Sequence, residues 1–307
     1  MNALLFPGQG SQVVGMGSEF HKKFELVKKI FKQADEKLNY SISQLILDGP
    51  EDKLQLTMNT QPAILTVSYS IFRVLKDEFG LNYHEYKYFA GHSLGEYSAL
   101  VCSESLDFKD ALYLLKERGK AMQNAVPVGK GAMVAVLGCE VEELKTIFGK
   151  MKSKEVCEIA NDNAPGQLIV SGEINAIKEL KEILIKDNKK NISLPVSAPF
   201  HCSLMNKASE EMKDKINLIN FNIPKIDIVS NITASPEKDP NKIKKLLIDQ
   251  IFSTVRWRES IELIQKNGVK TFIEIGPGKV LSGLTKRIAR GVKIININNI
   301  KDLDFFK

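Results

Sequence analysis

The chain has 307 residues, of which 43% are hydrophobic and 26% charged, and a formal net charge of +6; this describes an ordinary globular protein, large enough to divide into subdomains. No apolar run approaches the length of about 18 residues that a membrane-crossing helix needs, and the N-terminus lacks the basic start of a secretion signal. The four cysteines form no CxxC pair and the four histidines no metal-ligand spacing. We therefore expect a cytoplasmic protein with reduced thiols, no metal and no membrane contact. Basic residues are spread along the chain without a nucleic-acid-binding motif, so we expect no nucleic-acid partner.

Most of the chain alternates short apolar runs with amphipathic stretches, a pattern typical of α/β folds. In the first part this predicts a strand at 3–6, helices at 18–38 and 63–79, a strand ending at Ala90, and helices at 96–102 and 107–125. In the last third it predicts helices at 203–215, 241–252, 257–267 and up to Ala289, and strands at 226–230, 271–275 and 293–297.

The middle of the chain has a different order of elements. Strands are predicted at 131–137, 156–160, 167–171 and 191–196, and helices at 141–148 and 175–185. This β-α-β-β-α-β order is that of the ferredoxin-like unit. The predicted fold is therefore an α/β-hydrolase-like parallel-sheet domain, formed by 1–127 and 197–307, with an inserted ferredoxin-like small domain at 128–196.

The pentapeptide Gly-His-Ser-Leu-Gly at 91–95 lies between the strand that ends at Ala90 and the helix at 96–102. Gly-x-Ser-x-Gly in that position is the nucleophile-elbow pattern, whose tight turn lifts the serine above the sheet. Its glycines leave out a Cβ where the backbone comes close to the helix, and the N–H of Leu94 lies at a helix start that can hold an oxyanion. Ser93 is the candidate nucleophile; the alternative is a turn that matches by chance.

A serine nucleophile needs a base within hydrogen-bond reach, and His201 is the best-placed histidine, because it follows a loop of prolines and small residues. The alternative for His201 is a buried core histidine. The side chains of adjacent residues point apart, so His92 cannot easily reach the Ser93 hydroxyl. His92 is instead expected to support the turn. The third group stays open. Asp162 and Asp187 lie between Ser93 and His201, as the acid of an α/β-hydrolase triad does, but a backbone or amide carbonyl can also accept the second imidazole N–H.

Six motifs occur in one order along the chain. They are Phe-Pro-Gly-Gln-Gly-Ser-Gln at 6–12, Gly-His-Ser-Leu-Gly-Glu-Tyr at 91–97, Lys-Glu-Arg-Gly-Lys-Ala-Met at 116–122, Asn-Asp-Asn-Ala-Pro-Gly-Gln at 161–167, Ser-Ala-Pro-Phe-His at 197–201 and Glu-Ile-Gly-Pro-Gly at 274–278. With these motifs the chain closely resembles the malonyl-CoA:acyl carrier protein transacylases, the stand-alone acyltransferases of type II fatty-acid synthesis. The resemblance extends from Ala3 to beyond Gly283, and the ordered set is far more specific than any single motif.

The resemblance implies a role for each matching residue. Ser93 would take the malonyl group from coenzyme A, and His201 would act as general base and then as acid for the leaving thiol. Arg118, which its charged neighbours alone would place on a helix surface, would pair with the malonyl carboxylate, as a guanidinium fork suits. The other implied site residues are Gln9 and the Leu94 N–H in the oxyanion hole, a main-chain carbonyl at Gln250 that orients His201, and His92, Phe200 and Asn161, which support or line the pocket.

The implied reaction is two half-reactions through one serine ester, with malonyl-CoA and acyl carrier protein as substrates and no cofactor. By the same resemblance the carrier protein is acidic, which suits the charge of +6, and the enzyme is expected to be a monomer. Phe200 would crowd an α-methyl group, which disfavours methylmalonyl. Two other classes stay open: a serine thioesterase or esterase on the same elbow, and a non-catalytic subunit that docks the carrier protein.

Overall fold

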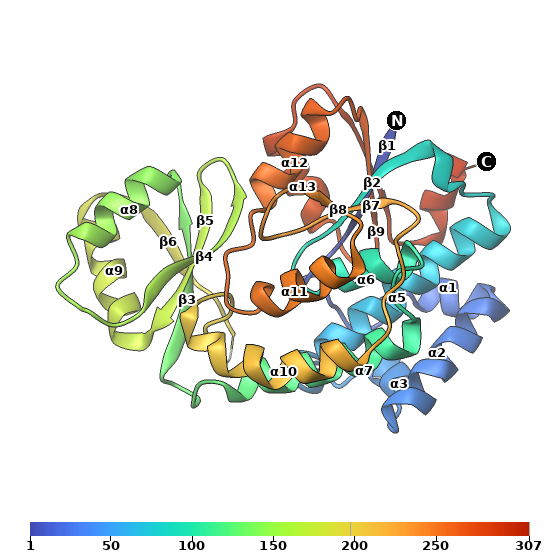
Figure 1. The fold of residues 1–307 in the computed structure, drawn as a ribbon, viewed down its shortest axis with the longest axis horizontal. Helices are drawn as coiled ribbons and strands as arrows, with labels where there is room; N and C mark the ends of the chain where they lie inside the picture. Colours follow the sequence, from blue (N-terminus) through green and yellow to red (C-terminus); the bar gives the residue numbers. More distant parts are fainter. Residues whose placement is uncertain (197, 307) are drawn as a thin grey trace.

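The structure is a computed structural model that describes residues 1–196 and 198–306. Ser197, which opens the motif before His201 and marks the expected domain boundary, lies outside the described residues, as does Lys307. A larger part built on a mostly parallel sheet lies beside a smaller part built on an antiparallel sheet (Figure 1). Within the described ranges, no helix combines the length and the apolarity that crossing a membrane requires.

The large sheet has six strands in the order β10-β9-β1-β2-β7-β8. They are β1 (Asn2–Phe6), β2 (Tyr86–Gly91), β7 (Asp227–Val229), β8 (Pro236–Glu237), β9 (Thr271–Ile275) and β10 (Lys293–Ile297). From β10 to β7 the neighbours pair in parallel, whereas the two-residue edge strand β8 pairs antiparallel to β7. The expected α/β class with a parallel sheet is confirmed, and the start of the chain forms the centre of that sheet.

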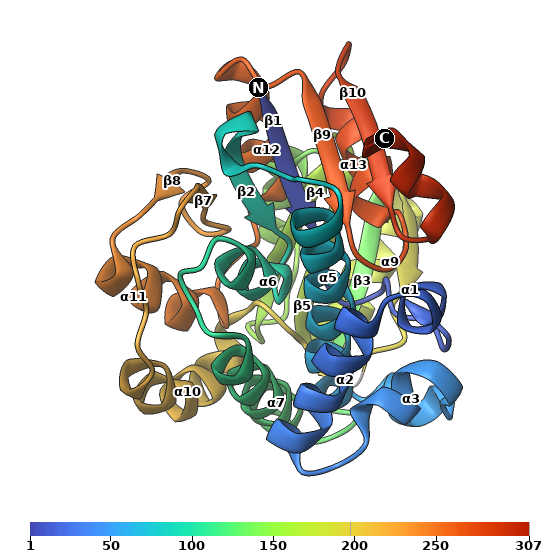
Figure 2. The ribbon, with the colours of Figure 1, turned by 90° about the vertical axis from the view of Figure 1, so that its right-hand side faces the viewer.

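Helices cover both faces of this sheet (Figure 2). On one face lie α5 (Thr57–Glu78) and α6 (Gly95–Cys102), with α2 (Glu25–Leu38), α7 (Phe108–Asn124) and α10 (Asn206–Leu218) packed outside them; on the other lie α12 (Trp257–Lys266) and α13 (Val280–Ile288). Leu4 and Phe6 of β1 enter the first core, and Ala3 and Leu5 the second. Because both faces of β1 are buried, it can be apolar at each of these positions, which is why it stands out in the sequence.

The helical elements before Ser93 differ from the prediction. The expected helix at 18–38 is two helices, α1 (Ser18–Lys23) and α2, because Phe24 between them is extended. Its periodicity runs on across the break because Phe20 and Val27 enter the same core. Two short helices, α3 (Ile42–Asp48) and α4 (Glu51–Leu54), were not predicted, and α5 begins before Pro62 rather than after it.

The small sheet has the order β4-β5-β3-β6, and every neighbouring pair is antiparallel. Its elements are β3 (Gly131–Leu137), α8 (Val141–Gly149), β4 (Cys157–Ala164), β5 (Gln167–Glu173), α9 (Ile174–Lys186) and β6 (Lys190–Ser193). The predicted β-α-β-β-α-β order is thus observed. Side chains such as Val134, Leu144 and Leu180 form a hydrophobic core of their own between this sheet and its two helices.

One strand of the small sheet is longer than predicted, and the difference matters for the site. The segment between the strands predicted at 156–160 and 167–171 is largely strand as well, because β4 continues to Ala164 with register shifts on either side of Asn161 and Asp162. The outer edge of β4 pairs with the larger part: the N–H of Asp162 donates to the Val255 carbonyl at 2.9 Å, and the N–H of Val255 to the Ala160 carbonyl at 2.9 Å. The polar side chains at 161–163 gave no sign of a strand in the sequence, although the backbone there is hydrogen-bonded to the larger part of the molecule.

The last strand of the small sheet is shorter than predicted. β6 ends at Ser193 rather than at Val196. Leu194 still donates its N–H to the Met133 carbonyl at 3.0 Å, but the chain then leaves the sheet as a loop toward His201. The alternation of apolar residues cannot mark the end of this strand, because Leu194 and Val196 pack their partly buried side chains against the larger core.

Candidate active site

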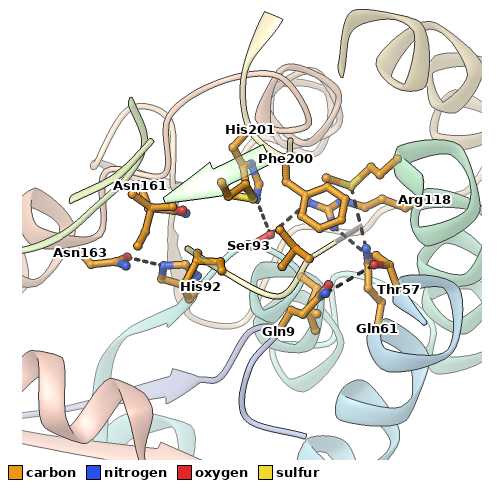
Figure 3. A pocket seen from close by; sticks show the side chains of 16 residues that line it. Gln9, Thr57, Gln61, His92, Ser93, Arg118, Asn161, Asn163, Phe200 and His201 are labelled. Atoms are coloured by element: carbon orange, nitrogen blue, oxygen red, sulfur yellow. Dashed lines mark hydrogen bonds between the residues drawn. The ribbon is translucent and has the colours of Figure 1, made fainter. Parts of the chain in front are cut away.

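The turn between β2 and α6 carries Ser93 at the end of the large sheet (Figure 3). Its φ of 53° lies in the left-handed region, where a side chain is strained. A Cβ on Gly91 would lie 1.9 Å from the Gly95 carbonyl carbon, and one on Gly95 would lie 2.2 Å from the Phe6 carbonyl oxygen. Backbone contact thus requires both glycines, and the turn has the geometry of a nucleophile elbow.

Ser93 and His201 meet across the site although 108 positions separate them. The Ser93 Oγ lies 2.8 Å from the His201 Nε2, and the His201 Nδ1 lies 2.9 Å from the main-chain carbonyl of Gln250. A carbonyl only accepts, so Nδ1 carries the proton and Nε2 is free to accept the serine proton. Gln250 is the last residue of α11 (Pro240–Gln250), where a helix leaves carbonyls available.

The electrostatic surroundings keep His201 neutral. Burial, and next the positive charge of Arg118, lower the pKa of His201 to about 3. An imidazole with that pKa is unprotonated at neutral pH, which is the state a general base needs before it takes a proton.

Arg118 lies on α7 and is 1% exposed, so it is not the surface arginine that its neighbours indicate. Its Nη1 donates to the Gln61 Oε1 at 2.8 Å, and its Nη2 donates to the Ser93 Oγ at 3.2 Å and to the Gln250 Oε1 at 2.9 Å. These acceptors are neutral, and Nε has no partner in the described chain. A buried cation that is hydrogen-bonded only to neutral groups is costly, so the arrangement suits an anionic ligand.

A cavity of about 180 Å³ opens beside these side chains and is lined by both parts of the molecule. The larger part contributes Gln9, Thr57, Gln61, His92, Ser93, Leu94, Arg118 and Met122, and the smaller part Met133, Asn161, Asn163 and Ile169. The connecting loop adds Leu194, Val196, Phe200 and His201. Apolar walls with one cation suit a short acyl chain that ends in an acid.

The two residues expected in the oxyanion hole border this cavity. Gln9 follows β1, and its Nε2 makes one long hydrogen bond, 3.4 Å, to the Thr57 Oγ1. Leu94 immediately precedes α6, and its N–H donates to no acceptor in the described part of the chain. Both groups therefore have donor capacity available on the Ser93 side of the cavity.

His92 lies in the elbow but makes no hydrogen bond to the Ser93 hydroxyl. Its Nε2 donates to the Asn163 Oδ1 at 2.8 Å, and its ring packs against Trp257 with centroids 5.5 Å apart. Burial lowers the pKa of His92. The residue therefore connects the turn to β4 of the small sheet.

Neither aspartate that the sequence left open bonds His201. Asp162 pairs with Arg258 at 2.7 Å, and Asp187 pairs with Lys150 at 2.9 Å. The Gln250 carbonyl takes the position that a triad acid would occupy. Among the described residues, no group of three His, Cys, Asp or Glu side chains is arranged to hold a metal ion.

Two further polar residues behind the elbow escaped the sequence reasoning. Asn231 accepts the Ser93 N–H at 2.7 Å and donates to the Gly91 carbonyl at 2.7 Å. Glu96 is 3% exposed and lies on α6, of which every residue is buried. A signal existed for each: Asn231 follows the end of β7, the strand next to β2, and Glu96 is the charged residue of an otherwise uncharged, apolar helix.

Comparisons with known proteins agree with this geometry. The model of the acyl transferase domain family matches residues 3–301. A malonyl CoA-acyl carrier protein transacylase of Bacillus subtilis is 43% identical, over 98% of this chain and 95% of that protein. The structure of an acyl carrier protein S-malonyltransferase from Vibrio cholerae superposes with a TM-score of 0.96 at 42% identity, covering 100% of this chain and 99% of that one.

A third relative was solved with its partner. It is a malonyl-transacylase in complex with a type II PKS acyl carrier protein, and it matches with a TM-score of 0.95 and 37% identity over 99% of this chain and 98% of that one. The family match and the identities extend over nearly the whole length of the chain. The chain therefore belongs to the acyl transferase family.

Proposed function

We propose that this chain transfers a malonyl group from coenzyme A to acyl carrier protein through an ester on Ser93, and so supplies fatty-acid synthesis. The observation that carries the proposal is the meeting of three groups at one atom: the Ser93 Oγ lies 2.8 Å from the His201 Nε2 and 3.2 Å from the Arg118 Nη2. A nucleophile, a neutral base and a buried cation suit a thioester whose acyl group ends in a carboxylate. The relatives named above carry this activity in their names.

In the first half-reaction the Ser93 Oγ attacks the thioester carbonyl carbon while its proton moves to the His201 Nε2. The carbon–sulfur bond breaks, and coenzyme A leaves as a thiol with that proton. The Gln250 carbonyl accepts the Nδ1–H throughout and stabilises the imidazolium. Gln9 and the Leu94 N–H hold the oxyanion.

In the second half-reaction the phosphopantetheine thiol of the carrier protein gives its proton to His201 and attacks the ester. The carbon–oxygen bond breaks, and Ser93 regains a proton from His201. Atoms and protons balance with coenzyme A and the carrier thiol alone, so the proposed cycle needs no cofactor; the coenzyme A thioester is a substrate.

Selectivity follows from Arg118 and the pocket walls. A malonyl carboxylate gives the buried guanidinium a directly bonded anion, whereas an acetyl group leaves it bonded only to neutral groups. Phe200 narrows the space beside an α-carbon and disfavours methylmalonyl. Asn161 lines the pocket, and His92 holds the elbow against β4.

The proposal includes a division of the chain. Residues 1–127 and 197–307 form an α/β-hydrolase-like domain, and residues 128–196 form an inserted ferredoxin-like unit. The strand order β4-β5-β3-β6, the two helices α8 and α9, and the separate hydrophobic core support the second assignment. The cavity then lies between the two domains, where it shields the ester from water.

The proposed partner is an acidic acyl carrier protein, attracted by the net charge of +6. The enzyme acts as a monomer in the cytoplasm in this proposal. One monomer suffices for the chemistry, because every side chain assigned a role above comes from the same chain.

Intact-mass spectrometry after rapid mixing with malonyl-CoA tests the proposal. The wild-type protein should gain one malonyl group, and Ser93→Ala should gain none. Arg118→Ala should lose the malonyl adduct while keeping acylation by acetyl-CoA, because an acetyl group has no carboxylate to pair with the guanidinium. Release of coenzyme A by the wild type with no adduct and no acceptor thiol would instead identify a thioesterase, and an inert wild type would leave only carrier docking.

A further inference from the structure

A carboxylate lies buried directly behind the nucleophile elbow and belongs to none of the groups assigned above. Glu96 lies three positions after Ser93, in the first turn of α6, and is 3% exposed. Its Oε2 accepts the side-chain N–H of Gln250 at 2.8 Å and the main-chain N–H of Asn231 at 3.1 Å. A buried carboxylate is costly unless its oxygens are hydrogen-bonded, so both donors are part of what keeps it there.

Each of the two residues that Glu96 holds contacts the reacting groups. The Gln250 carbonyl binds the His201 Nδ1, and the Gln250 Oε1 accepts from Arg118. The Asn231 Oδ1 accepts the Ser93 N–H, and the Asn231 Nδ2 donates to the Gly91 carbonyl at the start of the turn. The Glu96 carboxylate therefore binds directly to Gln250 and Asn231, the two residues that orient Ser93, His201 and Arg118.

The Gln250 amide group has one orientation that suits all its partners. Its Nε2 donates to Glu96 at 2.8 Å, while its Oε1 faces the Arg118 Nη2 at 2.9 Å. If the amide rotated, its N–H would face the guanidinium, two donors together, and its oxygen would face the carboxylate, two acceptors together. Glu96 thus determines which end of the Gln250 amide faces Arg118.

We propose that Glu96 is a positioning residue, whose carboxylate holds Gln250 and Asn231 so that Ser93, His201 and Arg118 keep one arrangement. That these three groups react rests on the proposed function. The hydrogen bonds that join Glu96 to Gln250 and Asn231 are observed independently of it. Hydrogen bonds to a carboxylate are about twice as strong as those between neutral groups. Burial raises the pKa of Glu96 to about 7, whereas the bonds from Asn231 and Gln250 and the positive charge of Arg118 favour its ionised form.

A comparison of three substitutions tests this role. Glu96→Ala removes the acceptor. Glu96→Asp shortens the side chain and so moves the carboxylate away from Gln250 and Asn231. Glu96→Gln keeps a side chain of the same length with one acceptor oxygen. We measure two quantities in rapid-quench experiments: the rate constant for acylation of Ser93 by malonyl-CoA and the amplitude of that step. The rate constant reports positioning, whereas the amplitude reports the fraction of folded sites.

The expected loss in rate constant for Glu96→Ala is about 100-fold, the size that a misplacement of reacting groups by about 1 Å can cause. The acylation rate constant of Glu96→Gln should be at least about tenfold higher than that of Glu96→Ala, because the glutamine oxygen can still accept hydrogen bonds from Gln250 and Asn231. If Glu96→Ala does not fold, Glu96→Asp carries the test, with a full amplitude and a rate constant lowered at least about tenfold.

Glu274 provides a matched control. It is 1% exposed on β9, and its carboxylate accepts the N–H groups of Leu281 at 3.1 Å and Ser282 at 2.7 Å, at the start of α13. Its partners in the described structure are Leu281, Ser282 and Asn296, and none of them lines the cavity or has a role in the proposed reaction. Glu274→Ala should therefore lower the amplitude through instability and leave the acylation rate constant at its wild-type value.

A fluorophosphonate that labels activated serines gives a second readout, which needs neither malonyl-CoA nor Arg118. Its rate of reaction with Ser93 should fall in the order wild type, Glu96→Gln, Glu96→Ala. Wild-type labelling without a malonyl adduct would contradict the proposed function and leave this order as the test of Glu96. Folded Glu96 variants that label and acylate with wild-type rate constants, at whatever amplitude, would overturn the positioning role.

Discussion

Around Ser93, burial acts on an acid and on a base in opposite directions. It lowers the pKa of His201 to about 3 and raises the pKa of Glu96 to about 7. Both shifts favour the uncharged form, as desolvation requires. Burial lowers the pKa of Arg118 as well, but a guanidinium is not deprotonated in proteins, so Arg118 keeps its charge in the same interior. The site is therefore built for one incoming negative charge.

The raised pKa of Glu96 predicts a pH-dependent stability that Glu96→Gln removes. The pKa is about 7 in the folded protein against an ordinary 4.5, so the folded state binds the proton more tightly than the unfolded state does. This stabilisation is complete below pH 4.5 and is lost as the pH rises through 7. Relative to Glu96→Gln, the wild type should lose about 3 kcal/mol of unfolding free energy between pH 4.5 and pH 8. Urea unfolding at several pH values measures it; a constant difference would contradict the shift.

At the scale of elements, the site depends on how closely α6 approaches the centre of the large sheet. The helix begins at Gly95, over the end of β1, and both glycines of the turn lie against backbone atoms. The Gly-x-Ser-x-Gly pattern between a strand and a helix predicted this approach correctly, because its cause is local. Most individual strands and helices of the α/β pattern were predictable for the same reason, because the spacing of their apolar residues is local.

Contacts between distant segments were not predictable from local patterns. The break at Phe24 and the true end of β4 depend on what each segment packs against or pairs with, and β4 pairs with Val255 of the other part. The residues behind the elbow show the same limit. Asn231 reaches Ser93 over 138 positions, and no spacing rule spans that distance.

The close approach at Gly95 predicts a large effect of one methyl group. Gly95→Ala would put a Cβ 2.2 Å from the Phe6 carbonyl oxygen, so the helix must move away from β1. We expect a loss of about 1–3 kcal/mol in unfolding free energy, the usual cost of overpacking, together with loss of the Ser93 adduct. Gly283→Ala is the control, since Gly283 lies in α13 with open space around its Cα.

In that control the alanine should stabilise the helix by about 0.5–1 kcal/mol and leave acylation unchanged. Thermal unfolding and the malonyl adduct are measured on both variants. A stable, fully acylating Gly95→Ala protein would mean that the contact with β1 is not required.

At the scale of the whole molecule, the cavity belongs to neither part alone. Side chains from the elbow side and from β3, β4 and β5 line it together. Arg258 of α12 binds Asp162 of β4 at 2.7 Å, and the backbone of Val255 pairs with the same strand. The two parts are thus joined beside the cavity, which suits the proposed ester on Ser93, because that ester must be protected from water.

The charge of the whole chain predicts how the carrier protein is captured. A net charge of +6 attracts an acidic partner over a distance that salt shortens to a Debye length of about 8 Å at physiological ionic strength. The value of kcat/KM for acyl carrier protein should therefore fall as salt is added, while the rate of acylation at saturating malonyl-CoA should not. Steady-state kinetics from low to high salt measure both; a salt-independent kcat/KM would contradict electrostatic steering.

The long sequence separations within the site also govern when the protein becomes active during its synthesis. The serine leaves the ribosome early, whereas its base follows 108 positions later and the Gln250 side chain bonds the serine's carbonyl across 157 positions. The strand β9, which flanks the central β1, is made later still. In the proposed mechanism, a nascent chain therefore carries Ser93 for most of its synthesis without His201 and Gln250, and we expect it to stay inert toward thioesters until nearly its whole length has been made.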